Sequence, residues 1–402
     1  MAVNLEQPGV LLPVAGVRLS AVNAGIRYKG RNDMVLVELA EGSQCAGVFT
    51  RNRFCAAPVQ VSREHLAQGK VRYWLINAGN ANAGTGEPGM QAARQSCAGL
   101  AALAGCEAGA VLPFSTGVIG VQLPVEKLHT AFPPALAALD ENHWLEAARG
   151  IMTTDTLPKA ISRQVTLPGG TVTLTGIAKG SGMIHPDMAT MLGFVATDAQ
   201  VEAALLQQLL SEVADETFNA ITVDGDTSTN DSLVLAATGA SGVRVGAAER
   251  DAFREALRAV CSFLAQAIVR DGEGATKFIS IHVHEARDKA EARKVGQTVA
   301  LSPLVKTAMF ASDPNWGRIL AAIGRSPVDD LDVAHISIRL GDTLLIEAGE
   351  PAASYREEMG QQEMKKAEID VHVRLGRGEA SATVWTCDFS YEYVRINAEY
   401  RS

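Results

Sequence analysis

The spacing of apolar residues divides the first half of the chain into strands and a helix. Residues 71–76 (VRYWLI) are almost uniformly apolar, which is typical of a buried strand, and the glycine- and asparagine-rich stretch 77–89 after it favours turns. Residues 90–105 are rich in alanine and predict a helix that stops at Gly105. Apolar and polar residues alternate over 171–178 (TVTLTGIA), which indicates another strand.

The second half predicts two longer helices and a series of strands. Leucines and valines recur at helical spacing over 200–216, and Asp198 is placed to cap that helix. A longer apolar stripe predicts a helix over 249–270. The strand 278–284 follows, and four later segments, of which the last is 380–396, alternate as antiparallel strands with short turns. The pattern as a whole predicts a mixed α/β protein.

Length and composition place the chain among ordinary globular proteins. A chain of 402 residues favours two or three domains, and 47% hydrophobic with 20% charged residues is typical of a water-soluble protein. The net charge of −9, without a long basic cluster, disfavours nucleic acid and anionic membranes as partners. The uncharged run 108–125 contains prolines and glycines, so we interpret it as buried strand and loop instead of a membrane helix.

The cysteines and the N-terminus favour a cytoplasmic protein without a metal centre. Six cysteines are scattered without any CxxC spacing, which argues for reduced thiols and against a zinc site. The N-terminal residues lack the features of a signal peptide. The stretch 224–231 (DGDTSTND) resembles a calcium loop, but it lacks that loop's glycine and final glutamate. A phosphate-binding loop at 77–89 is less favoured than a tight turn, because its glycine spacing fits no nucleotide motif.

The stretch 179–194 (KGSGMIHPDMATMLGF) places Thr190 after a turn-prone run and at the start of an apolar one. A turn that leads into a buried strand explains this pattern, and so does a threonine nucleophile exposed by cleavage of the preceding peptide bond. A threonine at a new N-terminus carries its own base, because a free α-amine titrates near pH 7.7–8.0 in model peptides. Lys179 is a candidate positive group beside it.

A second candidate lies in 113–120 (PFSTGVIG). Thr116 offers a hydroxyl and Gly117 an unobstructed backbone N–H, two donors that could face one developing oxyanion. The same three residues Ser-Thr-Gly are more often a simple turn. Composition and spacing alone leave this question open.

The stretch 179–194 closely resembles the signature of the ornithine acetyltransferase family, the glutamate N-acetyltransferases of arginine biosynthesis. The resemblance covers the whole chain, because further blocks occur in the family's order. These blocks are 47–59 (GVFTRNRFCAAPV), 77–86 (NAGNANAGTG), 115–120 (STGVIG), 152–156 (MTTDT), 222–232 (TVDGDTSTNDS), 269–278 (VRDGEGATKF), 312–319 (SDPNWGRI) and 393–400 (YVRINAEY).

The resemblance implies a layered α/β/β/α fold and a precursor that cuts itself between Ala189 and Thr190. The products would be an alpha chain of residues 1–189 and a beta chain of residues 190–402, which fold together into one core. An (αβ)2 heterotetramer is the implied assembly.

The resemblance also implies the reaction, the transfer of the acetyl group of N-acetyl-L-ornithine to L-glutamate through an acetyl-Thr190 intermediate. Thr116 and Gly117 would form the oxyanion hole, and neither a cofactor nor a metal is implied. The implied substrate contacts are Thr153, Lys179, Thr190, Glu273, Asn397 and the C-terminal Ser402. Many family members end in threonine, and Ser402 keeps the hydroxyl and the terminal carboxylate.

The residue chemistry agrees with these roles. Lys179 can pair with the substrate carboxylate, and Glu273, just beyond the helix 249–270, can pair with its ammonium group. Two rival interpretations stay open, an amidase or aminopeptidase of the same fold that uses water as acceptor, and a non-catalytic binding protein with an uncut chain. The sequence also leaves open whether acetyl-CoA is a second acetyl donor, which would make the enzyme bifunctional.

Overall fold

The computed structural model describes residues 2–185 and 191–399 and divides into two compact units. The larger one, here the layered unit, comprises residues 6–219 and 226–268, and the C-terminal unit comprises residues 1–5, 220–225 and 269–402. Two units agree with the number expected from the chain length. The border between them differs from the predicted cleavage point, and the predicted residues Ala189, Thr190 and Ser402 lie outside the described residues.

The layered unit contains two main sheets. The four-stranded sheet has the order β1-β2-β4-β5, and the five-stranded sheet has the order β3-β11-β8-β7-β6. Their strands are β1 (Val17–Val22), β2 (Met34–Leu39), β4 (Tyr73–Asn80), β5 (Val111–Val118), β3 (Gln44–Phe49), β11 (Ser232–Ala237), β8 (Leu192–Thr197), β7 (Gly170–Lys179) and β6 (Lys159–Leu167). A small pair joins β9 (Gln200–Val201) to β12 (Arg244–Val245).

The two sheets pack face to face around an apolar core. Phe194 of β8 is fully buried, with its ring centroid 5.7 Å from that of Trp74 in β4 and 5.1 Å from that of Phe114 in β5. Such tilted and edge-on aromatic pairs stabilise a core beyond the area that they bury. Residues from both sheets form one continuous cluster.

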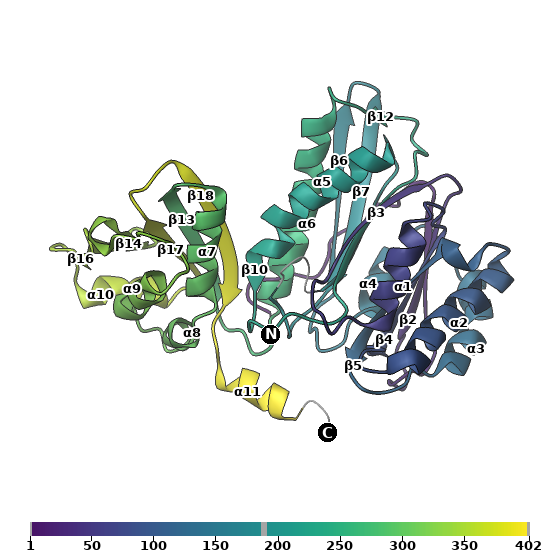
Figure 1. Cartoon of the computed structure of the whole chain (residues 1–402), viewed down its shortest axis with the longest axis horizontal. Coiled ribbons are helices and arrows are strands. Elements are labelled where there is room, and N and C mark those ends of the chain that lie inside the picture. Colours follow the sequence, from purple (N-terminus) through teal and green to yellow (C-terminus); the bar gives the residue numbers. More distant parts are fainter. Residues whose placement is uncertain (1, 186–190, 400–402) are drawn as a thin grey trace. The chain divides into compact units, whose positions relative to one another are not determined.

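Helices cover the two outer faces of this pair of sheets (Figure 1). α2 (Gly86–Ala104) and α3 (Val125–Ala137) pack on the four-stranded sheet. α5 (Ala203–Glu216) and α6 (Arg250–Arg270) lie on the five-stranded sheet, where Gly176 of β7 leaves room for α6. α1 (Ala57–Leu66) and α4 (Trp144–Gly150) complete the unit. The expected α/β/β/α layering is therefore confirmed.

The five-stranded sheet combines strands from both sides of the predicted cleavage point. β7 pairs antiparallel with β8, and Lys179 is the register partner of Leu192. β11 lies parallel to β8 on its other side and antiparallel to β3 beyond. Strands from before and after the predicted cut are therefore hydrogen-bonded neighbours within one sheet.

The C-terminal unit is a seven-stranded sheet with helices on one face. Its strand order is β10-β18-β13-β17-β14-β15-β16, and β17 runs parallel to β13. The strands are β10 (Ile221–Thr222), β18 (Ala380–Cys387), β13 (Phe278–Ala286), β17 (Glu368–Arg374), β14 (Ser337–Leu340), β15 (Thr343–Glu347) and β16 (Glu350–Pro351). The helices that pack on the sheet are α7 (Lys289–Ala300), α8 (Pro303–Phe310), α9 (Trp316–Gly324) and α10 (Glu357–Met364). The last helix, α11 (Tyr391–Ala398), has no buried residues.

Most predicted elements of the layered unit are confirmed, with two corrections. The helix predicted over 200–216 exists as α5, but Asp198 does not cap it. Asp198 instead accepts the backbone N–H of Thr173 at 2.9 Å, and the short strand β9 separates it from the helix. The stretch 77–89 is only partly a turn, because β4 continues to Asn80 and α2 begins at Gly86.

One correction concerns the end of the chain. The strand predicted over 380–396 ends at Cys387, and the residues from Tyr391 form the helix α11. The hydroxyl of Ser390 accepts the N–H of Tyr393 and caps the helix, a role for which serine is well suited. The prediction of antiparallel strands is confirmed for the pairing of β17 with β14, whereas β17 runs parallel to β13 on its other side.

Phe194→Ala tests the packing between the two sheets. Removal of the buried ring should lower the free energy of unfolding by about 3–5 kcal/mol, because a cavity remains between Trp74 and Phe114. Phe54→Ala is the matched control, since Phe54 is 57% exposed and its truncation should change little. Urea unfolding of both variants measures the difference, and equal stabilities would contradict the face-to-face packing.

Candidate active site

Thr116 and Gly117 lie in the strand β5, so the alternative interpretation of Ser-Thr-Gly as a turn is wrong. Gly117 has a φ of 134°, a conformation that favours glycine. A Cβ atom at this position would lie 2.2 Å from the carbonyl carbon of Gly79 in β4. The neighbouring strands therefore approach closely here, and only glycine fits.

Lys179 reaches Thr116 from the other sheet. Lys179 is the last residue of β7, its side chain is only 10% exposed, and its Nζ donates to Thr116 Oγ1 at 3.3 Å. The predicted positive group and the predicted hydroxyl donor therefore lie side by side, although 63 residues separate them in the sequence.

Asp155 connects this pair to Thr153, and sequence reasoning missed it. One oxygen of its fully buried carboxylate accepts from Lys159 Nζ and from the N–H of Gly180, each at 2.7 Å. The other oxygen accepts the N–H of Thr153 at 3.0 Å and lies 3.9 Å from Lys179 Nζ. The block 152–156 (MTTDT) contained the only sequence signal for this residue.

Asp155 is ionised despite its burial. Burial by itself raises the pKa of a carboxyl group, but the charges of Lys159 and Lys179 and the hydrogen bonds from Lys159 and Gly180 outweigh it here. Together they hold the pKa of Asp155 well below its usual range. The buried negative charge in turn orients Lys179 beside Thr116.

Glu273 and Asn397 form a second group within the C-terminal unit. Asn397 Nδ2 donates to Glu273 Oε2 at 2.9 Å, and Glu273 is buried just beyond the end of α6, as the sequence predicted. Asn397 lies near the end of α11. Of the predicted site residues that the structure describes, Thr116, Gly117, Thr153 and Lys179 belong to the layered unit, and Glu273 and Asn397 to the C-terminal unit.

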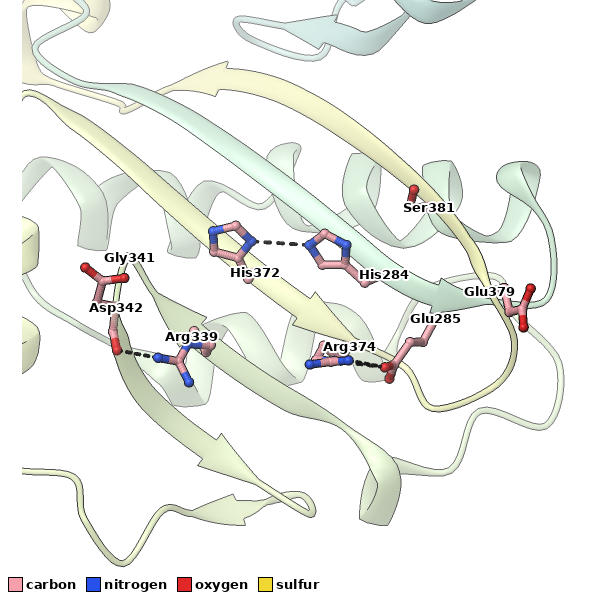
Figure 2. A pocket seen from close by; sticks show the side chains of 9 residues that line it. All are labelled: His284, Glu285, Arg339, Gly341, Asp342, His372, Arg374, Glu379 and Ser381. Carbon is pink, nitrogen blue, oxygen red and sulfur yellow. Dashed lines mark hydrogen bonds and ion pairs between the residues drawn. The ribbon is translucent and has the colours of Figure 1, made fainter.

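A pocket of about 510 Å³ lies on the face of the C-terminal sheet that the helices leave open (Figure 2). His284 Nε2 and His372 Nδ1 are 3.2 Å apart on its floor, and Arg374 Nε donates to Glu285 at 2.9 Å. Burial and nearby positive charge lower the pKa of both histidines. The lining contains none of the residues that the sequence singled out, so we do not assign the pocket to the predicted reaction.

The described residues contain neither a candidate metal site nor a candidate membrane-spanning helix. Within residues 2–185 and 191–399, no group of three or more His, Cys, Asp or Glu side chains is arranged to hold a metal ion. None of the described helices has both the length and the apolar content needed to cross a bilayer.

Two facing sheets between helix layers, with a hydroxyl, a glycine N–H and a lysine brought together on them, define a layered α/β/β/α enzyme. The sequence profile of the ArgJ family matches residues 18–402. The chain therefore belongs to the ArgJ family.

The chain is also similar to individual proteins. The chain is 56% identical over 395 residues to the arginine biosynthesis bifunctional protein ArgJ of Methylococcus capsulatus, which covers 98% of this chain and 97% of that protein. The crystal structure of arginine biosynthesis bifunctional protein argJ from Bacillus halodurans has 42% identity and a TM-score of 0.50, and covers 52% of this chain and 99% of that chain. The ornithine acetyltransferase of Mycobacterium tuberculosis, solved with ornithine, has 34% identity and a TM-score of 0.39, and covers 45% of this chain and 96% of that chain. The acetyltransferase family recognised in the sequence is confirmed, and the chain is an acetyltransferase of arginine biosynthesis.

Asp155→Asn tests the buried ion network. Because the folded-state pKa of Asp155 is lowered, its charge contributes stability above the ordinary carboxyl pKa of about 3.9 and loses it as the pH falls further. The variant should lose about 3–5 kcal/mol of unfolding free energy at pH 7, since Lys159 and Lys179 are left without their buried partner. Its deficit relative to the wild type should shrink below about pH 4.

Urea unfolding at pH 7 and at about pH 2.5, where the carboxyl group of the unfolded chain is largely protonated, would measure this difference. The exposed residue Glu141 offers the matched control Glu141→Gln, which should leave stability unchanged at both pH values. A deficit of the same size at both pH values would contradict an ionised Asp155.

Proposed function

We propose that the chain cleaves itself between Ala189 and Thr190 and then transfers the acetyl group of N-acetyl-L-ornithine to L-glutamate. The observation that carries this proposal is the contact between Lys179 and Thr116 beside Gly117. This contact brings a positive charge, a hydroxyl and a backbone N–H to one place, and such groups stabilise an oxyanion that forms during acyl transfer. Family membership gives the substrate class.

Self-cleavage needs only the chemistry of Thr190 and water. The Thr190 hydroxyl attacks the carbonyl carbon of Ala189, the bond to the Thr190 nitrogen breaks, and the hydroxyl proton goes to that nitrogen. Water then hydrolyses the resulting ester, which leaves a carboxylate on Ala189 and a free hydroxyl and α-amine on Thr190. The half-length chain of the Bacillus halodurans structure supports such a cut, because residues 190–402 make up a similar share of this chain.

Acetyl transfer then uses the new N-terminus as nucleophile and base. The Thr190 α-amine accepts the hydroxyl proton while the oxygen attacks the acetyl carbonyl of N-acetylornithine, and ornithine leaves with a proton. Because Lys179 Nζ donates to Thr116 Oγ1, the Thr116 hydroxyl hydrogen is available for the oxyanion, next to the Gly117 N–H. Glutamate then takes the acetyl group from Thr190 through the same steps. The threonine supplies its own base, so we propose no cofactor.

The remaining residues are assigned to substrate recognition. Lys179 is suited to the substrate carboxylate, and Glu273 to the side-chain ammonium group of ornithine. Asn397 holds the Glu273 carboxylate in place through its 2.9 Å hydrogen bond. Thr153 and Ser402 complete the substrate contacts that the resemblance implies, and Ser402 lies outside the described residues.

The second acetyl donor and the assembly are also part of the proposal. The Methylococcus capsulatus protein is called bifunctional, and we propose that this chain likewise uses acetyl-CoA as a second donor to make N-acetylglutamate. We also propose a cytoplasmic (αβ)2 heterotetramer. An amidase or aminopeptidase that uses water is the weaker alternative, since family membership favours the acetyltransferase.

Incubation of the purified protein with N-acetylornithine tests the reaction. We expect the chain that begins at Thr190 to gain the mass of one acetyl group, and labelled acetyl to appear on added glutamate with ping-pong kinetics. Intact mass spectrometry and initial-rate measurements would show both results. Acetate as the only product would instead identify the amidase.

Thr190→Ala is the control for this experiment. The variant should remain a single uncut chain of 42.4 kDa without acetyl uptake, because the attacking oxygen is absent. Cleavage of this variant at the same bond would exclude Thr190 as the nucleophile of the cut.

Asn397→Ala tests the recognition of the ammonium group. The variant should cleave normally but lose about tenfold in kcat/KM for N-acetylornithine, because Glu273 loses the donor that orients it. Val394→Ala on the same helix is the control, since Val394 is 65% exposed. A kcat/KM within about twofold of the wild type would remove Asn397 from the site.

A further inference from the structure

Glu273 lies in a loop, residues 271–277, that joins α6 to β13 and contains neither helix nor strand. The N–H of Ala275 donates to the carbonyl oxygen of Gly272 at 2.9 Å, which closes a four-residue turn with Glu273 at its second position. Gly274 follows with a φ of 71°, which favours glycine at the third position of such a turn. One turn does not fix the direction of the Glu273 side chain, so contacts with other elements must do so.

The Glu273 carboxylate lacks a cationic partner within the part of the chain that the structure describes. Glu273 is only 7% exposed, and its one side-chain hydrogen bond there comes from the neutral amide of Asn397. A buried carboxylate without an opposite charge is costly, so this arrangement favours a cationic ligand. The side-chain ammonium group of ornithine fits that requirement.

Asp388, which directly follows β18, holds the loop just after Glu273. It is 1% exposed, and its Oδ1 accepts the N–H groups of Thr276 at 2.8 Å and Lys277 at 2.9 Å. Its Oδ2 accepts the hydroxyl of Thr276 at 2.5 Å. Hydrogen bonds to a carboxylate are among the strong ones, so these three fix the backbone of the loop to the end of β18.

Ser390 joins the same loop to α11. Its hydroxyl donates to the carbonyl oxygen of Gly274 at 2.6 Å and accepts the N–H of Tyr393 at 3.4 Å, the contact that caps the helix. A Cβ atom at Gly274 would lie 2.4 Å from the nitrogen of Tyr393, so the turn lies directly against the start of α11. One hydroxyl group therefore links the residue after Glu273 to the helix that carries Asn397.

α11 has little apolar burial to hold it in place. None of its residues is buried, and a helix of eight residues is not stable by itself. Two ring contacts lie at its start, Tyr391 with Phe310 and Tyr393 with Phe389. Near its end the contact with the loop is the hydrogen bond from Asn397 to Glu273. The position of Asn397 therefore depends on how the start of the helix is fixed.

We propose that Asp388 and Ser390 are positioning residues that hold Glu273 and Asn397 as one recognition unit for the side-chain ammonium group of N-acetylornithine. Asp388 fixes the loop, and Ser390 fixes the loop relative to α11. This inference rests on the proposed role of Glu273 in substrate binding. Because the two residues act through Glu273, their loss should reduce selectivity for an ammonium group and leave the transfer chemistry intact.

The selectivity between two donors tests this role. N-acetyl-L-norleucine carries a methyl group in place of the ammonium group, so it cannot pair with Glu273. Ser390→Ala and Asp388→Ala should each lose about tenfold in kcat/KM for N-acetylornithine and stay within about twofold of the wild type for N-acetylnorleucine. A merely structural role would lower the values for both donors alike.

Two further variants serve as rescue and control. Asp388→Asn keeps an acceptor at Oδ1 and places an amide beside the Thr276 hydroxyl, so its selectivity should stay within about threefold of the wild type. Ser381→Ala, at an exposed position on β18, is the matched control for Ser390→Ala and should behave as the wild type. Denaturing gels confirm that each full chain has been processed as the wild type, and circular dichroism compares the folds.

A double variant shows whether Ser390 acts through Glu273. Glu273→Gln removes the negative charge and should itself abolish most of the selectivity for the ammonium group. The addition of Ser390→Ala to Glu273→Gln should then change kcat/KM for N-acetylornithine by less than about twofold, because residues that act through one group are not additive.

The outcomes decide the proposal. Wild-type selectivity in a folded Ser390→Ala or Asp388→Ala chain overturns it, as do equal losses for both donors, an Asp388→Asn chain as impaired as Asp388→Ala, or fully additive losses in the double variant. If Asp388→Ala does not fold, Ser390→Ala decides, and if the wild type does not use N-acetylnorleucine, the double variant decides.

The proposed function can fail separately. Reduced selectivity in Glu273→Gln with normal selectivity in Ser390→Ala refutes this inference alone. Normal selectivity in Glu273→Gln refutes the proposed role of Glu273 and this inference with it. A wild-type chain that transfers no acetyl group overturns the proposed function and this inference together.

Discussion

The buried carboxylate of Asp155 is the constraint on which the described site depends. An ion removed from water costs several kcal/mol unless opposite charges and hydrogen bonds replace its hydration. Lys159, Lys179 and two backbone N–H groups provide that replacement. Because the carboxylate needs these partners, it holds the end of β7 next to Thr116 and ties the Thr153 segment to the same place.

A second constraint is the shared five-stranded sheet. β7 precedes the predicted cut and β8 and β11 follow it, yet the three strands are hydrogen-bonded neighbours. Cleavage between Ala189 and Thr190 would break one covalent bond and leave these ladders and the aromatic core around Phe194 in place. A chain built in this way can gain a new N-terminus while its strands on both sides of the cut stay hydrogen-bonded to one another.

The pKa values of the buried carboxyl groups of Asp155 and Asp231, both in the layered unit, are shifted in opposite directions for a simple reason. Asp155 has two ammonium groups nearby and is ionised, whereas burial dominates at Asp231. Opposite shifts of this kind often separate the roles of acids in a catalytic site. Here the charged carboxylate of Asp155 lies beside Lys179 and Lys159.

The sequence alone determined the α/β class, most helices and buried strands, the family, and the choice of Thr116, Gly117, Lys179, Glu273 and Asn397, because these depend on local periodicity or contiguous motifs. It could not reveal that Ser-Thr-Gly lies in a strand, that β17 is parallel to β13, or that residues 391–398 form a helix. It also missed Asp155, since the charge and the partners of its carboxyl group depend on which distant residues surround it. Only the tertiary structure brought Lys159, Lys179 and Gly180 around Asp155, because long-range packing, and not local sequence, sets burial and electrostatic environment.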